Sequence, residues 1–152
     1  MSAEGAANNK KITISGALRT SLDLYESFKV IPFCLLQNAI KYSFDTDIAI
    51  NFSSNNREIE FAVESNGPPI KEEEKTKIFE RGYRGEWSKR IHHEGQGIGL
   101  YIAKIVADAH GLEIKVRSST AGYQRDGIPV YCNKFYIKFP IGNPVERRLA
   151  PR

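Results

Sequence analysis

The stretch Gly95–Gly111, GQGIGLYIAKIVADAHG, sets three glycines at alternate positions directly before an apolar run. It fits neither the dinucleotide fingerprint G-x-G-x-x-G nor the P-loop pattern G-x-x-x-x-G-K-[ST]. The apolar residues after the glycines recur at i, i+3, i+4, i+7, i+8 and i+11, which predicts an amphipathic helix that Gly111 ends. Its expected core-facing stripe is Ile98, Tyr101, Ile102, Ile105, Val106 and Ala109.

A second helix is predicted upstream, between Leu24 and Ser43. Apolar residues recur there every three or four positions, at Phe28, Ile31, Leu35, Ala39 and Tyr42. Pro32 interrupts this pattern, because proline costs about 3 kcal/mol in a helix interior but little in a first turn. We therefore expect either a kink at Pro32 or a helix that begins near Ile31.

Alternation of apolar and polar residues predicts most of the strands of a sheet. Two alternating runs flank the polar turn SSNNR and predict an antiparallel hairpin whose inward residues are Ile48, Ile50, Phe52, Ile59, Phe61 and Val63. GPPI ends the second run, because proline cannot donate a hydrogen bond to a neighbouring strand. KITIS at Lys11–Ser15, LEIKVRS and IPVYCNKFYIKFP predict further strands, and KEEEKTKIFE predicts a short charged helix.

Length and composition fit one compact domain, which we place at residues 11–141, between a disordered leader (1–10) and a flexible basic tail (142–152). The 152 residues are 41% hydrophobic and carry a formal net charge of +4. That charge suits an anionic ligand, and it equally suits a solvated basic surface. Nucleic-acid binding is disfavoured, since no basic-aromatic motif accompanies the charge.

The cysteines, the first residues and the short apolar runs favour a cytoplasmic location. Cys34 and Cys132 lie far apart in a chain whose start, MSAEGAANNK, lacks the apolar core of a signal peptide, so reduced thiols are expected. The longest apolar run, Val30–Leu36, is too short to insert directly into a membrane.

One predicted helical face combines reactive side chains with apolar surroundings. Cys34, Asn38, Lys41 and Tyr42 follow i, i+4, i+7 and i+8 spacing, so they share a stripe. A buried amide has to be hydrogen-bonded, so Asn38 either crosslinks core backbone or binds a ligand. Lys41, one turn on, can offer its ammonium group to a phosphate. From the helix alone both roles of Asn38 stay open.

Four motifs in order resemble the histidine-kinase branch of the gyrase, Hsp90, histidine kinase and MutL (GHKL, Bergerat-fold) ATPase superfamily. LLQNAIKYS is similar to its N box, VESNGPPI to its first glycine box, KIFERGYRG to its F box, and GQGIGLYIAKIVADAHG to its second glycine box. The resemblance runs from about Ile12 to Pro140. Pattern and resemblance together predict an α/β two-layer sandwich, with a mixed sheet of about five strands and three helices on one face.

The resemblance implies a site for ATP and Mg²⁺. Asn38 would hold Mg²⁺ through its amide oxygen, a hard ligand for a hard cation, and Lys41 would contact phosphate. Gly95, Gly97 and Gly99 would end a flexible lid and cradle phosphates at a helix N-terminus, because glycine permits close approach and positive φ. Further implied nucleotide contacts are Tyr42, Ser65, Gly67, Ile70, Phe79, Arg84, Ile98 and Leu100.

Several of these contacts have specific implied roles. Gly67 would let a strand end pass close to the adenine, with Ile70 packing beneath the base. Phe79 would pack the base of the lid, which spans Tyr83–Glu94 and is expected to be mobile without nucleotide. Arg84, like Arg81, would reach phosphate or a partner domain, or remain a solvated charge.

The chain departs from the resembled pattern in three places. The adenine-reading Asp falls on Ser65, and the neighbouring Glu64 points to the opposite face of its strand. Cys34 begins the N-box stripe, where a neutral thiol is a weak Mg²⁺ ligand and no general base. The family's Gly-Thr before the last strand becomes Asn133-Lys134.

The leading hypothesis is an ATP-binding catalytic domain of a sensor-histidine-kinase-like protein, cytoplasmic or the cytoplasmic part of a membrane-bound sensor. It would transfer the γ-phosphate of Mg-ATP to a histidine on a separate dimerisation domain or chain, from which a response regulator would receive it. His92, His93 and His110 are expected to have no catalytic role. The alternatives are a degenerate nucleotide-binding or protein-interaction module with weak or no kinase activity, and a serine kinase of anti-sigma type.

Overall fold

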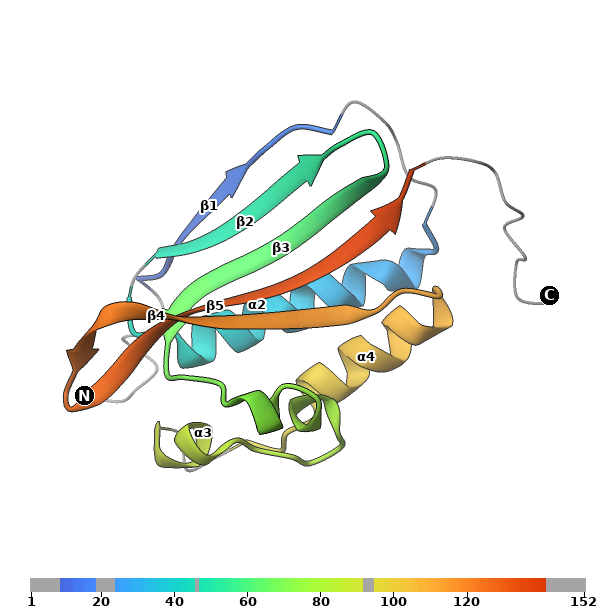
Figure 1. The fold of residues 1–152 in the computed structure, drawn as a ribbon. Helices are drawn as coiled ribbons and strands as arrows, with labels where there is room; N and C mark the ends of the chain where they lie inside the picture. The colour runs from blue at the N-terminus through green and yellow to red at the C-terminus, as the bar shows by residue number, and fades with distance from the viewer. Residues whose placement is uncertain (1–8, 19–23, 46, 92–94, 142–152) are drawn as a thin grey trace.

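The computed structural model describes residues 9–18, 24–45, 47–91 and 95–141 of the chain. Its strands form one five-stranded sheet in the order β1-β2-β3-β5-β4. β1 pairs with β2 in parallel and every other neighbouring pair is antiparallel, so the sheet is mixed. Helices α2 and α4 pack on one face of this sheet (Figure 1). The predicted two-layer α/β sandwich is confirmed.

The elements follow one another in an order close to the predicted one. The strands are β1 (Lys11–Ser15), β2 (Asp47–Ser54), β3 (Glu58–Gly67), β4 (Ile114–Arg125) and β5 (Ile128–Pro140). The helices are α2 (Val30–Tyr42), α3 (Glu86–Ile91) and α4 (Gly99–Ala109), with 3₁₀ helices at Glu26–Lys29, Glu72–Glu74 and Lys77–Phe79. None of the helices among these described residues is long and apolar enough to cross a membrane.

The β2–β3 hairpin has the predicted register. Ile50 pairs with Val63 and Phe52 with Phe61, so all four side chains point to the same face of the sheet. That face carries the core, in which Ile48, Ile59 and Val63 are almost completely buried. β3 ends at Gly67, directly before the two prolines that were predicted to stop it.

The first long helix begins afresh rather than kinking. A 3₁₀ helix ends at Lys29 and α2 starts at Val30, which leaves Pro32 in the first turn, where its missing N–H has no partner to lose. Ile31, Leu35 and Ala39 form its buried face. The second of the two alternatives for Pro32 is therefore confirmed.

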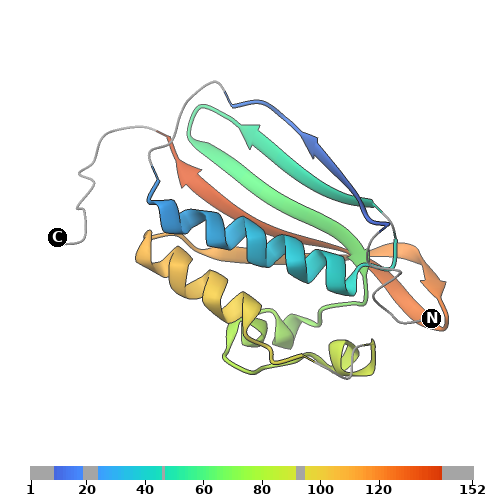
Figure 2. The ribbon, with the colours of Figure 1, turned by 180° about the vertical axis from the view of Figure 1, so that it is seen from behind.

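The buried face of α4 differs from the predicted stripe. Ala103 and Ala107 are fully buried, whereas Ile102 and Ile105 are 40% and 49% exposed. α2 and α4 lie side by side on the sheet (Figure 2) and contact each other, and small side chains at such a contact let two helices pack closely. Periodicity located the helix correctly. It did not identify which of two adjacent rows of side chains on that helix faces the core.

The segment KEEEKTKIFE, predicted as one short charged helix, forms two separate 3₁₀ helices. Glu74 and Phe79, the last residues of the two 3₁₀ helices, are buried, so each of these helices is anchored in the protein interior. The third α-helix, α3, lies instead at Glu86–Ile91, within the predicted lid. Residues 92–94 of that lid lie outside the described residues, as do most of the predicted leader and the predicted basic tail.

The α4 packing can be tested by exchanging small and large residues on its two faces. We expect Ala103→Leu to lower the free energy of unfolding by about 1–3 kcal/mol, because the extra atoms force α2 and α4 apart. Ile105→Ala on the exposed face should change it by less than about 0.5 kcal/mol. Urea unfolding of both variants measures this. If Ile105→Ala destabilises the protein more than Ala103→Leu does, the predicted stripe is the buried face of α4 after all.

Candidate functional site

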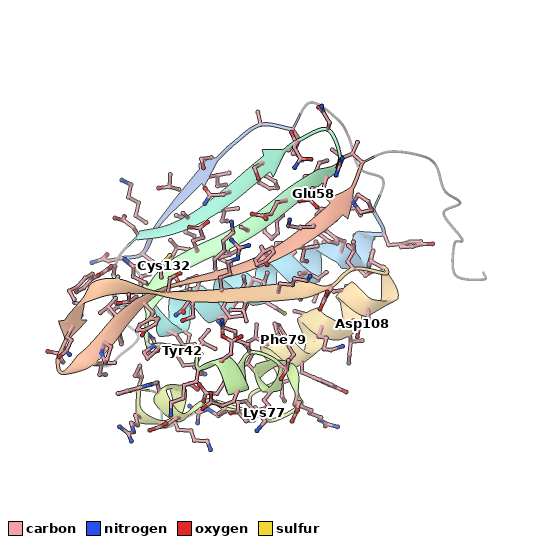
Figure 3. The ribbon with its side chains drawn as sticks, viewed as in Figure 1. Tyr42, Glu58, Lys77, Phe79, Asp108 and Cys132 are labelled. Carbon is pink, nitrogen blue, oxygen red and sulfur yellow. The ribbon has the colours of Figure 1, made fainter. Side chains whose placement is uncertain are left out.

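A cavity of about 1120 Å³ lies along α2, among the end of β3, the middle of β5, α3 and the start of α4. The structure gathers in its lining the predicted site residues Asn38, Lys41, Tyr42, Ser65, Ile70, Arg84, Gly95, Gly97, Ile98, Gly99 and Leu100. These residues come from four motifs that are far apart in the sequence. Tyr42 marks this end of α2 in Figure 3.

Two predicted contacts do not line the cavity. Gly67 is buried, and a β-carbon there would lie 2.7 Å from the carbonyl oxygen of Tyr42, so glycine is required by the packing of β3 against α2. Phe79 is 7% exposed and packs edge-to-face on Phe135, with 6.4 Å between ring centroids. Both residues therefore belong to the packing that surrounds the cavity and not to its lining. Of the two arginines, Arg84 lines the cavity and Arg81 is exposed elsewhere.

One end of the cavity is built to receive an anion. Ile98 caps α4 with no side-chain hydrogen bond, so the first backbone N–H groups of the helix face outward without intrahelical partners. Lys41 lies at this end, because a β-carbon on Gly95 would come 2.4 Å from its Nζ. A β-carbon on Gly99 would meet no protein atom within 4 Å, which leaves room for a ligand against the backbone.

The three glycines have different reasons to be glycine. Gly95 and Gly97 have φ angles of +148° and +64°, which side chains strongly disfavour. Gly97 also packs tightly, since a β-carbon there would lie 2.6 Å from the carbonyl oxygen of Tyr83. Gly99 starts α4 without a positive φ. The predicted conformational reason thus applies to the first two glycines and is wrong for Gly99.

The sheet contributes two neutral polar groups to the cavity lining. Ser65 on β3 pairs directly with Asn133 on β5, and both residues line the cavity. Asn133 is only 7% exposed. Lys134 points to the other face of the sheet, where its Nζ lies 2.6 Å from a carboxylate oxygen of Glu60. Asn133 and Lys134 together replace the Gly-Thr pair of the resembled pattern. Because adjacent residues of a strand point to opposite faces of the sheet, only Asn133 lies on the cavity side.

Cys34 lines the cavity one turn before Asn38. Burial raises the pKa of the Cys34 thiol, so it is neutral near pH 7. Cys34 and Cys132 are both free, as expected. Within the described ranges, no three His, Cys, Asp or Glu side chains gather as a metal site. A metal ion here would need oxygen ligands from a bound phosphate in addition to Asn38.

A buried carboxylate, which no sequence pattern predicts, holds the lid side of the cavity in place. Glu74 is 6% exposed and accepts hydrogen bonds from the backbone N–H groups of Lys71 (3.1 Å) and Glu86 (2.9 Å). It therefore joins the 3₁₀ helix Glu72–Glu74 to the start of α3. In the run KEEEK, Glu74 is indistinguishable by pattern from its solvated neighbours.

α3 and the start of the chain supply further lining residues that sequence reasoning missed. Trp87 of α3 lines the cavity, and the guanidinium of Arg90 lies 5.0 Å from its ring centroid. Lys10, assigned to the leader, also lines the cavity and donates to the carbonyl oxygens of Ser43 and Asp45 at 2.8 Å each. The folded part of the chain therefore starts before Lys11.

The histidines take no part in the cavity where they can be placed. His110 Nδ1 lies 2.7 Å from the carbonyl oxygen of Val106, and its ring packs edge-to-face on Tyr25 and Phe28. These contacts agree with a structural role at the end of α4. His92 and His93 lie outside the described residues.

Comparison with known families gives one extensive match. The family described as histidine kinase-, DNA gyrase B-, and HSP90-like ATPases matches residues 31–141. Among curated proteins, the sensor histidine kinase YkoH of Bacillus subtilis is 39% identical over 93 residues, 61% of this chain and 20% of YkoH. The sensor histidine kinase GraS of Staphylococcus haemolyticus is 30% identical over 136 residues, 88% of this chain and 37% of GraS. The chain thus spans well under half the length of these relatives.

Solved structures share the fold. The mycobacterial sensor histidine kinase MprB aligns with a TM-score of 0.70 at 20% identity, covering 90% of this chain and 85% of the other. The catalytic domain of the histidine kinase ThkA aligns with a TM-score of 0.54 at 27% identity, covering 75% of this chain and 67% of the other.

The role of Glu74 can be tested by amide hydrogen exchange. We expect Glu74→Ala to speed exchange in α3 and to leave the central turns of α4 unchanged, because the variant removes the acceptor that holds the start of α3. Glu72→Ala is the matched control, since the Glu72 side chain is 84% exposed on the same 3₁₀ helix. Equal exchange in the two variants would contradict the role assigned to Glu74.

Proposed function

The chain belongs to the family of histidine kinase-, DNA gyrase B- and HSP90-like ATPases, and from that premise we propose that it is the ATP-binding catalytic domain of a sensor histidine kinase. One observation carries the proposal: Asn38, Lys41 and the start of α4 line the same cavity, and the ammonium group of Lys41 lies beside Gly95 in the loop before α4. An amide oxygen, an ammonium group and outward N–H groups are the set that a magnesium-bound triphosphate requires.

The chain's own part in the reaction is to bind and orient the triphosphate. The N–H groups of Gly99 and Leu100 and the ammonium group of Lys41 would each bond a phosphate oxygen, and such charge-assisted bonds are about twice as strong as neutral ones. Phosphoryl transfer needs little covalent chemistry from the protein, so rate is gained by placing the γ-phosphate in line with its acceptor. Lys41 would also stabilise the charge on the transferring group.

The site fits Mg²⁺ through Asn38. Mg²⁺ in nucleotide sites takes few protein ligands and completes its shell with phosphate oxygens and water, so one amide oxygen in the lining suffices. When bound, Mg²⁺ would neutralise charge on the phosphates. Cys34, one turn earlier, adds no ligand, because its thiol is neutral and soft.

The acceptor and the later partners lie beyond the structure. The proposed acceptor is a histidine on a dimerisation domain of the same or a partner chain, and a response regulator would take the phosphoryl group next. YkoH and GraS are named as sensor histidine kinases, and the chain matches only part of each. We place the domain on the cytoplasmic side, where ATP is available.

A second candidate function rests on two residues of the lining. Cys34 and Ser65 both line the cavity, and neither provides the group found at its position in the resembled pattern. They favour a module that binds nucleotide weakly and acts on a partner without transferring phosphate. Lys134 gives this alternative no support, because it lies on the other face of the sheet, away from the cavity.

The metal role of Asn38 gives a direct test of the proposal. We expect Asn38→Ala to weaken ATP binding about tenfold or more in Mg²⁺ and to have little effect in EDTA, because the amide acts through the metal. Calorimetric titration of both proteins with and without Mg²⁺ measures this. If ATP affinity is unchanged and only the melting temperature falls, Asn38 is a core crosslink, whose loss costs about 1–3 kcal/mol.

Asn51→Ala serves as the matched control for this titration. Asn51 lies on β2, donates to Glu64 at 3.2 Å and does not line the cavity. Its substitution should leave ATP affinity unchanged in both buffers. A wild-type chain that binds no ATP in either buffer would defeat the proposal outright.

A further inference from the structure

A row of three polar residues crosses the core face of the sheet. Ser65 of β3 pairs with Asn133 of β5, which pairs in turn with Ser118 of β4. The next row toward the middle of the sheet is apolar and consists of Val63, Phe135 and Val116. The face of the sheet therefore changes from apolar to polar within the cavity lining, which includes Phe135 of the apolar row and Ser65 and Asn133 of the polar row.

The amide of Asn133 is held in one orientation from both sides. Its Oδ1 accepts a hydrogen bond from Ser118 Oγ at 2.6 Å, and its Nδ2 donates to the carbonyl oxygen of Pro68 at 2.9 Å. Ser118 Oγ is fixed in turn, because it accepts from the backbone N–H of Ile70 at 3.1 Å. Flipping the amide would break both of its bonds, so its donor and acceptor have fixed positions.

Half of the hydrogen-bonding capacity of this amide is not used by the protein. An asparagine side chain has two N–H donors and two acceptor lone pairs. Within the part of the chain that the structure describes, the two bonds to Ser118 and Pro68 use one donor and one acceptor. Asn133 is 7% exposed and lines the cavity, so the remaining donor and acceptor are available to a ligand there.

We propose that Asn133 reads the edge of the purine base in this chain. The inference rests on the proposed function, because it takes the occupant of the cavity to be a nucleotide. An amide offers a donor and an acceptor side by side, which matches the amino group and ring nitrogen at the edge of adenine. A fixed amide also loses little conformational entropy when it binds.

The carboxylate next to Ser65 along β3 does not line the cavity. Glu64, next to Ser65 in sequence, lies on the opposite face of the sheet, where it accepts from Asn51 and lies 3.7 Å from Lys134 Nζ. The two residues of this polar row that line the cavity, Ser65 and Asn133, are both neutral. Because a hydroxyl group can also donate to the carbonyl of guanine, Ser65 beside Asn133 makes discrimination between ATP and GTP shallow.

The test compares ligands that differ by single groups on the full chain in Mg²⁺. The ligands are ATP, purine riboside triphosphate (which lacks the 6-amino group), GTP and inorganic tripolyphosphate (which lacks the base), each titrated by calorimetry. We expect the wild-type chain to prefer ATP to purine riboside triphosphate by about two- to tenfold, the value of one neutral hydrogen bond. GTP should bind within about tenfold of ATP.

Asn133→Ala should reduce the ratio of ATP to purine riboside affinity to about one and leave tripolyphosphate binding unchanged. Ser118→Ala frees one side of the amide without altering the cavity lining, so it should lower the ratio only partly. Combined with Asn133→Ala, it should have no further effect. Asn51→Ala, on the outer face of the sheet, should keep the wild-type ratio. If Asn133→Ala does not fold, Ser118→Ala carries the test.

Three results would overturn the assignment. A ratio that survives in Asn133→Ala and disappears in Ser65→Ala would give base reading to Ser65. An equal loss of affinity for all four ligands would make Asn133 a structural residue only. If the wild-type chain binds tripolyphosphate but neither ATP nor GTP, the cavity has no base site. A wild-type chain that binds none of the four defeats the proposed function itself, and this inference falls with it.

Discussion

The close approach of α2 and α4 is the constraint on which the site depends. Ala103 and Ala107 of α4 are fully buried in the core, and Ala39 of α2 is nearly so. Alanine at these positions lets the helices lie near enough for Lys41 of α2 to reach the loop before α4. Larger side chains would separate the amide and ammonium groups on one helix from the N-terminus of the other. The anion-binding end of the cavity is thus a result of core packing.

Most of the fold follows from periodicity, and the failures have a common cause. Alternation fixed the β2–β3 register, and the position of Pro32 restricted where α2 can begin. Periodicity did not reveal which face of α4 is buried, because that choice depends on the shape of a helix far away in sequence. The two 3₁₀ helices were missed for a similar reason, since Glu74 is held by a segment that follows it along the chain.

The site residues could be predicted where a local motif requires a particular backbone conformation. They were harder to predict where they are brought together by the pairing of distant strands. The alternating glycines and the N-box stripe led to residues that do line the cavity, while Gly67 and Phe79 belong to its support. Asn133 was noticed only as a departure, because its role depends on lying opposite Ser65 and Ser118. Strand order, which no local pattern specifies, brings these three residues together.

The position of Trp87 has a practical consequence. It is the only tryptophan in the chain, it lies on α3 within the cavity lining, and Arg90 covers its ring. Indole emission depends strongly on nearby charge and water, and in this chain all of it comes from Trp87 on the lid side of the cavity. The intrinsic tryptophan fluorescence of the unmodified chain therefore reports on changes at the lid side of the cavity. No dye or engineered label is needed.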